Sequence, residues 1–100
     1  MNITVAGATY AVHRPDDLDG QLIAATGMSA QEHLDSFGPA TLPGTLARFV
    51  RPFLAADAPC HQALAIGLEG DLARDRAGTL AAVRALAAAK PAKVGEGKPA

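Results

Sequence analysis

Hydrophobic and polar residues alternate along the first twelve positions, which is the pattern of a β-hairpin. Ala6-Gly7 can form the two-residue turn, because Gly7 readily takes the positive φ that such turns need. Pairing Val5 with Ala8 separates apolar from polar residues, and a one-residue slip would mix them. The predicted apolar face comprises Met1, Ile3, Val5, Ala8, Tyr10 and Val12. A two-stranded ribbon is barely stable alone, so we expect this face to cover the following helices or another chain.

Beyond Pro15 the apolar residues recur every three or four positions, which predicts a series of short amphipathic helices. Capping signals mark both ends of the first two helices. Asp16 or Asp17 precedes the first helix and Gly27 follows it. A capping box of Ser29 and Glu32 begins the second helix, and Gly38 follows it. The predicted inward positions of the two helices are Leu18, Leu22, Ala25, Leu34 and Phe37.

The third helical segment has the clearest amphipathic pattern, with Arg48 and Arg51 projecting away from its apolar stripe. Pro43 suits its first turn. Pro52 lacks an amide hydrogen and its ring clashes with the carbonyl of Arg48, so we expect a kink or break near Arg51. The stripe itself consists of Leu46, Phe49, Val50, Phe53 and Leu54.

Two more helices are expected before the helical spacing of apolar residues ends near residue 89. Asp57 is predicted to cap the first, and a break is predicted between Asp75 and Gly78. Thr79 is then predicted to cap the last helix. The residues predicted to be buried in these two helices are Leu64, Leu68 and Leu72, then Leu80, Val83 and Leu86 or Ala87.

The fold class predicted from these elements is α+β, with an N-terminal two-stranded hairpin followed by four or five short helices. Residues 1–89 are expected to form one domain. Residues 90–100 read Lys-Pro-Ala-Lys-Val-Gly-Glu-Gly-Lys-Pro-Ala, a composition that cannot bury enough surface to offset its ordering entropy, so a flexible tail is expected.

Composition predicts a thin core. The chain has 100 residues and 49% of them are hydrophobic, yet alanine supplies much of that fraction and only four residues are aromatic. A domain of this length has a single core, and few large side chains are available to fill it. A partner surface could supply the missing burial, and the uncovered strand edges of the hairpin favour self-association.

The charge balance and the cysteine count exclude several classes of function. The formal net charge is -1, so no overall field attracts nucleic acid or an anionic membrane. Cys60 is the only cysteine, so no intramolecular disulfide or CxxC site can form. No signal-peptide pattern and no long apolar run is present. We therefore expect a soluble protein of the cytoplasm, in a bacterial host if the protein is phage-encoded.

Candidate chemistry in the sequence is sparse. Cys60 follows a proline at a predicted helix start, which favours a thiolate, but neighbouring His61 points about 100° away and the expected state is a half-buried thiol. Neither His13 nor His33 stands at a metal-ligand spacing, and the glycines do not match a phosphate-binding loop. No enzyme activity, metal or cofactor is expected. The alternatives are a small enzyme using Cys60 and a small DNA-binding regulator, the latter disfavoured because only Arg48 and Arg51 stand together.

The order of elements resembles that of small tail assembly chaperones of long-tailed bacteriophages and phage-like gene transfer agents. The resemblance covers residues 1–89: a hairpin with Gly7 at its turn, a helix ending in Ala25-Thr26-Gly27-Met28-Ser29, then short helices. It implies a non-enzymatic protein that binds the long helical tape measure protein during tail assembly. An amphipathic helix of that kind fits a groove between short helices. The candidate partner-binding residues are Tyr10, Leu46, Phe49, Val50, Phe53 and Leu54.

Overall fold

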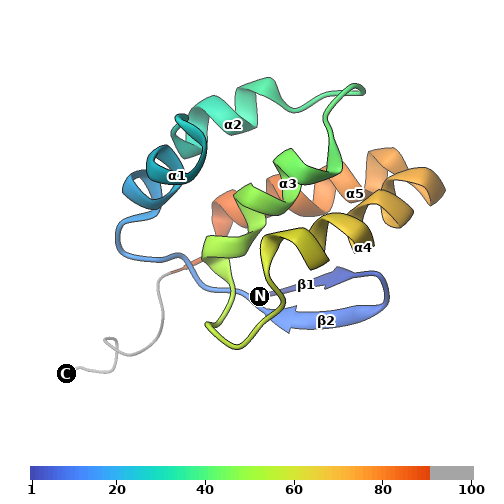
Figure 1. Cartoon of the computed structure of the whole chain (residues 1–100), viewed down its shortest axis with the longest axis horizontal. Coiled ribbons are helices and arrows are strands. Elements are labelled where there is room, and N and C mark those ends of the chain that lie inside the picture. Colours follow the sequence, from blue (N-terminus) through green and yellow to red (C-terminus); the bar gives the residue numbers. More distant parts are fainter. Residues whose placement is uncertain (91–100) are drawn as a thin grey trace.

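The computed structural model describes residues 1–90 (Figure 1). In chain order, its strands are β1 (Asn2–Val5) and β2 (Ala8–Ala11), its α-helices are α1 (Leu18–Thr26), α2 (Ala30–Ser36), α3 (Pro43–Val50), α4 (His61–Arg74) and α5 (Arg76–Arg84), and its 3-10 helices are η1 (Arg51–Phe53) and η2 (Ala85–Ala88). The predicted α+β class, a hairpin followed by five α-helices, is confirmed. Of the predicted tail, 90–100, all but Lys90 lies outside the described residues.

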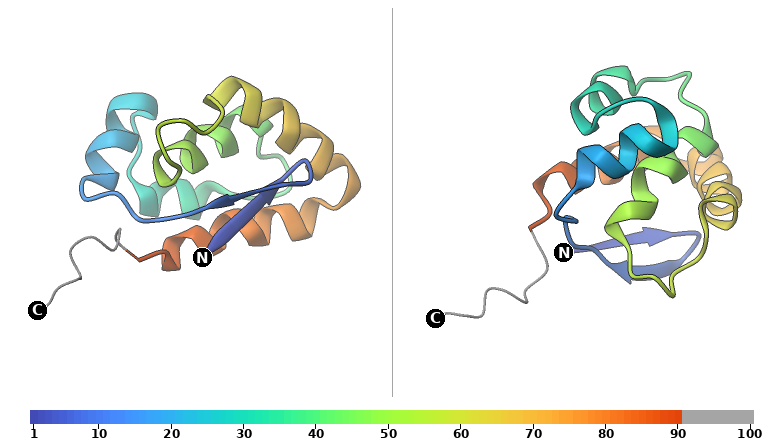
Figure 2. Two further views of the ribbon diagram at one scale, coloured as in Figure 1. Left: turned by 90° about the horizontal axis from the view of Figure 1, so that it is seen from below. Right: turned by 60° about the vertical axis from the view of Figure 1, so that its left-hand side comes forward.

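Helix α3 lies at the centre of the molecule (Figures 1 and 2). Helices α1 and α2 lie on one side of α3, and the hairpin lies on the other side, against α4. Every element except β2 contributes buried residues to the core, and Tyr10 of β2 packs against it half-buried. The largest fully buried side chains of the core are Phe49, Phe53, Leu22, Leu46, Leu64, Leu68, Leu86, His33, Val50 and Val83.

The hairpin has the predicted register. Val5 pairs with Ala8 and Ile3 pairs with Tyr10. Both turn residues have positive φ, 51° at Ala6 and 86° at Gly7, as a type I′ turn requires. The turn therefore agrees with the right-handed twist of the strands, although glycine is present at only one of its two central positions.

The predicted apolar face of the hairpin is only partly covered. Ile3, Val5 and Val12 are buried, whereas Met1 is 55% exposed, Ala8 is exposed and Tyr10 is half-buried. The helices of the same chain thus leave Met1 and Ala8 uncovered, and cover of these two residues by another chain stays a prediction. Of the two strands, β1 has the larger contact with α4. Alternation alone does not reveal how far a supporting helix reaches across a strand pair.

The capping signals of α1 and α2 act as predicted. Asp17 caps α1 by accepting a hydrogen bond from the Gly20 amide, and Gly27 ends the helix at a φ of 82°. At α2, the Ser29 hydroxyl accepts from the Glu32 amide at 3.3 Å, and the Glu32 carboxylate accepts from the Ser29 amide at 2.8 Å. Leu18 and Leu22 are buried, but Ala25 is exposed, contrary to the prediction, because it lines an open groove.

The break predicted at Pro52 is confirmed, since α3 ends at Val50 and the chain continues as the 3-10 turn η1. The cap predicted at Asp57 was wrong. Helix α4 begins at His61 with Cys60 as its N-cap, because Asp57 lies in a turn in which the Ala58 amide donates to the Ala55 carbonyl. Among residues 1–90, no helix combines the length and the hydropathy needed to span a bilayer.

The last helix begins earlier than predicted. The break at Asp75 is confirmed, but Asp75 itself caps α5 by accepting from the Gly78 amide at 3.0 Å, and Arg76 is already helical. Thr79, the predicted cap, instead donates its hydroxyl to the Asp75 carbonyl at 2.8 Å, within the first turn of α5. A single aspartate thus ends one helix and begins the next.

Asp75→Ala is expected to lower the free energy of unfolding by about 1 kcal/mol, because it removes the acceptor for a first-turn amide of α5. Thr79→Ala is the matched control, and we expect it to change stability by less than about 0.5 kcal/mol because the helix loses only a local side-chain bond. Urea denaturation of both variants measures the difference. Equal losses, or a larger loss for Thr79→Ala, would contradict the observed cap.

Candidate functional site

The predicted partner-binding stripe lies in the core of the free chain. Leu46, Phe49, Val50 and Phe53 are 0% exposed and Leu54 is 5% exposed, while Tyr10 is half-buried beside the core. None of the five stripe residues is exposed, although Leu54 lines the open groove described next, and Phe49 and Phe53 line a smaller pocket of about 200 Å³ beside α1 and α2. Their role in partner binding stays a prediction.

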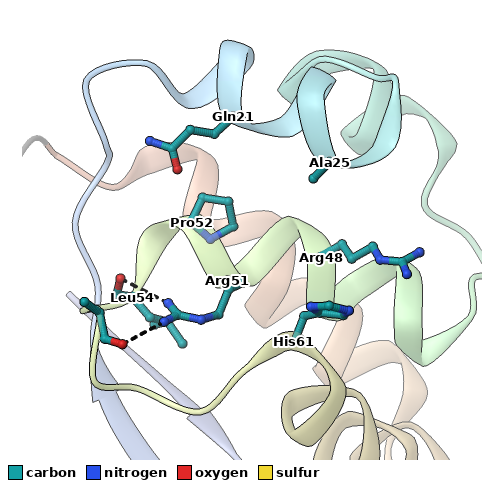
Figure 3. Close-up of a pocket in the computed structure, with 8 residues that line it drawn as sticks. Gln21, Ala25, Arg48, Arg51, Pro52, Leu54 and His61 are labelled. Carbon is teal, nitrogen blue, oxygen red and sulfur yellow. Dashed lines mark hydrogen bonds between the residues drawn. The ribbon is translucent and has the colours of Figure 1, made fainter.

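An open groove lies between α1 and the layer formed by α3, η1 and the start of α4. Its volume is about 570 Å³. Figure 3 shows Gln21 and Ala25 on α1 facing Pro52 and Arg48 across the groove, with His61 beside Arg48. The groove, called the α1–α3 groove below, is lined by Gln21, Ala25, Arg48, Arg51, Pro52, Leu54, Ala56 and His61.

The two arginines of the α1–α3 groove have different roles. The Arg51 guanidinium donates to the carbonyls of Leu54 at 3.4 Å and Ala56 at 3.2 Å, so it holds the loop after η1 in place (Figure 3). Arg48 is exposed and makes no side-chain hydrogen bond or ion pair with another residue of the described part of the chain. Arg48 therefore remains available for a ligand.

Sequence reasoning placed Arg48 and Arg51 away from the apolar stripe and predicted a groove between short helices with Leu54 among its residues. Of the predicted groove residues, Leu54 lines the α1–α3 groove. Gln21, Ala25 and Ala56 come from distant segments, and only tertiary packing brings them opposite the arginines. One signal was present in the sequence. A polar glutamine and a small alanine occupy successive turns of α1, which leaves room beside that helix.

Cys60 is an exposed thiol at the N-terminus of α4. The Ala63 amide lowers the pKa of this thiol most; desolvation opposes it, and the Gln62 amide and the Arg51 guanidinium lower it further. The prediction of a half-buried thiol was wrong, because α4 begins at His61 and leaves its N-cap in solvent. Within residues 1–90, no group of three or more His, Cys, Asp or Glu side chains is placed to hold a metal ion.

His33 is the one buried polar residue of the core over residues 1–90. Its Nε2 lies 2.8 Å from the Thr26 hydroxyl, which donates its own hydrogen to the Leu22 carbonyl. The imidazole must therefore donate from Nε2, which leaves Nδ1 as an unprotonated acceptor. No described residue bonds to Nδ1, and the rings of Phe37 and Phe49 lie nearby. Protonation would bury an N–H group without an acceptor.

Stability is expected to fall as the pH is lowered below about 6.5. Burial lowers the pKa of His33 from its ordinary value of 6.5, and Glu32 opposes this shift. Below pH 6.5 the His33 imidazole therefore becomes protonated in the unfolded chain before it does so in the folded chain, which favours unfolding. Above pH 6.5 the imidazole is neutral in both states, and the full stability is present. The loss cannot exceed about 1.4 kcal/mol per pH unit for one group.

Urea denaturation at several pH values between 5 and 8 measures this dependence. His33→Leu should remove it over the range above about pH 5, where carboxylates remain ionised. His61→Gln is the matched control and should keep it. A slope that survives His33→Leu would show that another group is responsible.

No family model, no curated protein and no solved structure matches this chain. The groove therefore has to be interpreted from its own residues. The resemblance to tail assembly chaperones stays a prediction that rests on the order of elements.

Proposed function

We propose that this chain is a non-enzymatic binding protein that takes up a helical segment of a protein partner in the α1–α3 groove. The observation that carries the proposal is the groove itself. Its volume of about 570 Å³ falls within the range of roughly 300–1,000 Å³ that ligand sites occupy, and it combines apolar with polar lining residues. Grooves between short helices are a common way to bind an amphipathic helix.

The specific partner that we propose is the tape measure protein of a phage-like tail, which would make the chain a tail assembly chaperone acting in the bacterial cytoplasm. The order of elements supports this choice. A tape measure is a long amphipathic helix, and its apolar stripe is prone to aggregation until it is covered. Covering such a stripe needs a binding surface and no catalytic group, metal or cofactor.

Co-expression tests the proposed function. The chain is produced together with the long helical protein encoded by a neighbouring reading frame, and the soluble fraction of that protein is measured with and without the chain. We expect the soluble yield to rise severalfold and the two proteins to elute together in size-exclusion chromatography. An unrelated domain of similar size is the control. An unchanged yield, or no long helical protein encoded nearby, would refute the assignment.

Two other classes of function make different predictions. An exposed thiol with a lowered pKa reacts quickly with alkylating reagents whether or not it is catalytic, so labelling of Cys60 does not identify an enzyme. Turnover that Cys60→Ser abolishes would do so. A DNA-binding regulator would bind duplex DNA at low salt and lose that affinity steeply as salt rises. Absence of binding at low salt removes that alternative.

A further inference from the structure

The α1–α3 groove carries positive charge and no negative charge. Its positive charge comes from Arg48 and Arg51, and no Asp or Glu is among its lining residues. The chain as a whole has a formal net charge of -1, yet two of its six arginines are gathered here. The groove is therefore complementary to an anionic group, although the protein as a whole has a slight negative charge.

The start of α4 adds to the positive potential at one end of the groove. His61 is the first residue of this 14-residue helix, and no acidic side chain lies in its first turn. The amide groups there lower the pKa of the neighbouring Cys60 thiol, as expected for the positive end of a helix. An anion bound near His61 and Arg48 would thus be favoured by side chains and backbone together.

The rest of the groove selects an apolar and helical occupant. Ala25, Pro52 and Leu54 give the groove its apolar lining, with Ala25 on α1 and Pro52 on the opposite wall (Figure 3). Helices α1, α3 and α4, the turn η1 and a loop supply all the lining residues, so no strand edge is available to pair with an extended peptide. A helical segment satisfies its own backbone hydrogen bonds and suits such a surface better.

We propose that the α1–α3 groove binds an acidic amphipathic helical segment of a protein partner, in which a Glu or Asp carboxylate meets the Arg48 guanidinium and apolar side chains cover Ala25 and Pro52. The proposal rests on the proposed function and adds the chemistry of the partner. Arg48 is the specificity-determining residue, because Arg51 is already committed to the carbonyls of Leu54 and Ala56.

Titration with matched peptides tests this inference. The probes are three short amphipathic helical peptides with one Leu/Ala face and with Glu, Gln or Lys at the flanking positions, and binding to the full chain is followed by NMR of backbone amides. We expect the Glu peptide to shift amides of α1 between Gln21 and Ala25 and of α3 near Arg48. Replacing Glu by Gln should weaken binding by about fivefold.

Variants at Arg48 make the result specific. Arg48→Gln should reduce the preference for the Glu peptide over the Gln peptide to nearly one, and Arg48→Glu should turn it toward the Lys peptide. Arg74→Gln, an exposed arginine on α4 far from the groove lining, is the control and should keep the preference. Both Arg48 variants alter an exposed side chain, and thermal unfolding verifies that they remain folded.

Several outcomes would overturn the inference. These are equal affinity for the Glu and Gln peptides, shifts outside the groove, no binding of any peptide, or a preference that Arg48→Gln leaves unchanged. Acetate at the same carboxylate concentration should not reproduce the shifts, and if it does, the groove is a small-anion site. If sedimentation shows that the chain self-associates and the groove is covered in that assembly, the occupant of the groove is a second copy of the chain, and the inference fails. If co-expression succeeds while the peptides fail, the proposed function survives without this inference.

Discussion

Phe49→Ala is expected to lower the free energy of unfolding by about 3–5 kcal/mol, which is the largest single loss that we predict for this chain. Phe49 is 0% exposed and lies at the centre of an aromatic cluster. Its ring centroid is 5.5 Å from His33, 5.3 Å from Phe37 and 5.4 Å from Phe53. Removal of the ring leaves a cavity that α2, α3 and η1 cannot fill by a small shift.

Urea denaturation measures this loss, and near-UV circular dichroism reports whether the aromatic packing is retained. Phe49→Leu keeps most of the volume and should remain folded with a smaller loss, so the comparison survives if the alanine variant does not fold. Leu42→Ala is the matched control, because Leu42 is 67% exposed and its truncation should cost little. A stability loss for Phe49→Ala no larger than that for Leu42→Ala would show that the stripe is not the core in solution.

Gly67→Ala and Gly70→Ala are expected to change stability in opposite directions, although both glycines lie inside α4. A Cβ atom at position 67 would lie 2.9 Å from the Cγ1 atom of Val5 and 3.1 Å from the Cβ atom of Ala6. The hairpin must therefore move away from the helix. We expect a net loss of about 1 kcal/mol, since the overpacking exceeds the gain in helix propensity.

At position 70 the nearest neighbour of an added Cβ is the flexible Arg74 side chain at 3.7 Å, an ordinary contact. Gly70→Ala should therefore stabilise the protein by about 0.5–1 kcal/mol through helix propensity alone. Chemical denaturation of the two variants under one set of conditions measures the contrast. Stabilisation by Gly67→Ala would mean that the hairpin does not approach α4 as closely as described.

The hairpin contact also has a polar part that the sequence did not indicate. The amide of Ala6, at the turn, donates to the Asp71 carboxylate at 2.9 Å, and Asp71 is also paired with Arg74. From the sequence alone, Gly67 is only a residue of low helix propensity, and Asp71 is only one of several charged residues near the end of a helix. Their role becomes visible when the turn lies against α4, 65 positions away along the chain.

Part of the candidate site could be anticipated and part could not. The helical spacing of the stripe predicted that Arg48 and Arg51 lie apart from it, and they line the groove. The same spacing could not distinguish a stripe that binds a partner from one that forms the core, because both need large apolar residues on one face. Phe49 and Phe53 are buried because α1, α2 and α4 cover that face.

Local physics in the sequence was sufficient for the hairpin register, the α2 capping box, the end of α3 before Pro52 and the helix break at Asp75. Each depends on residues a few positions apart, whose backbone preferences and hydrogen bonds do not need the rest of the chain. Only the tertiary structure decided which strand of the hairpin is covered and that His33 is buried with an unpaired nitrogen. It also decided that Gln21 and Ala25 face Arg48. These features depend on which distant surfaces meet, and the pattern along one segment does not contain that information.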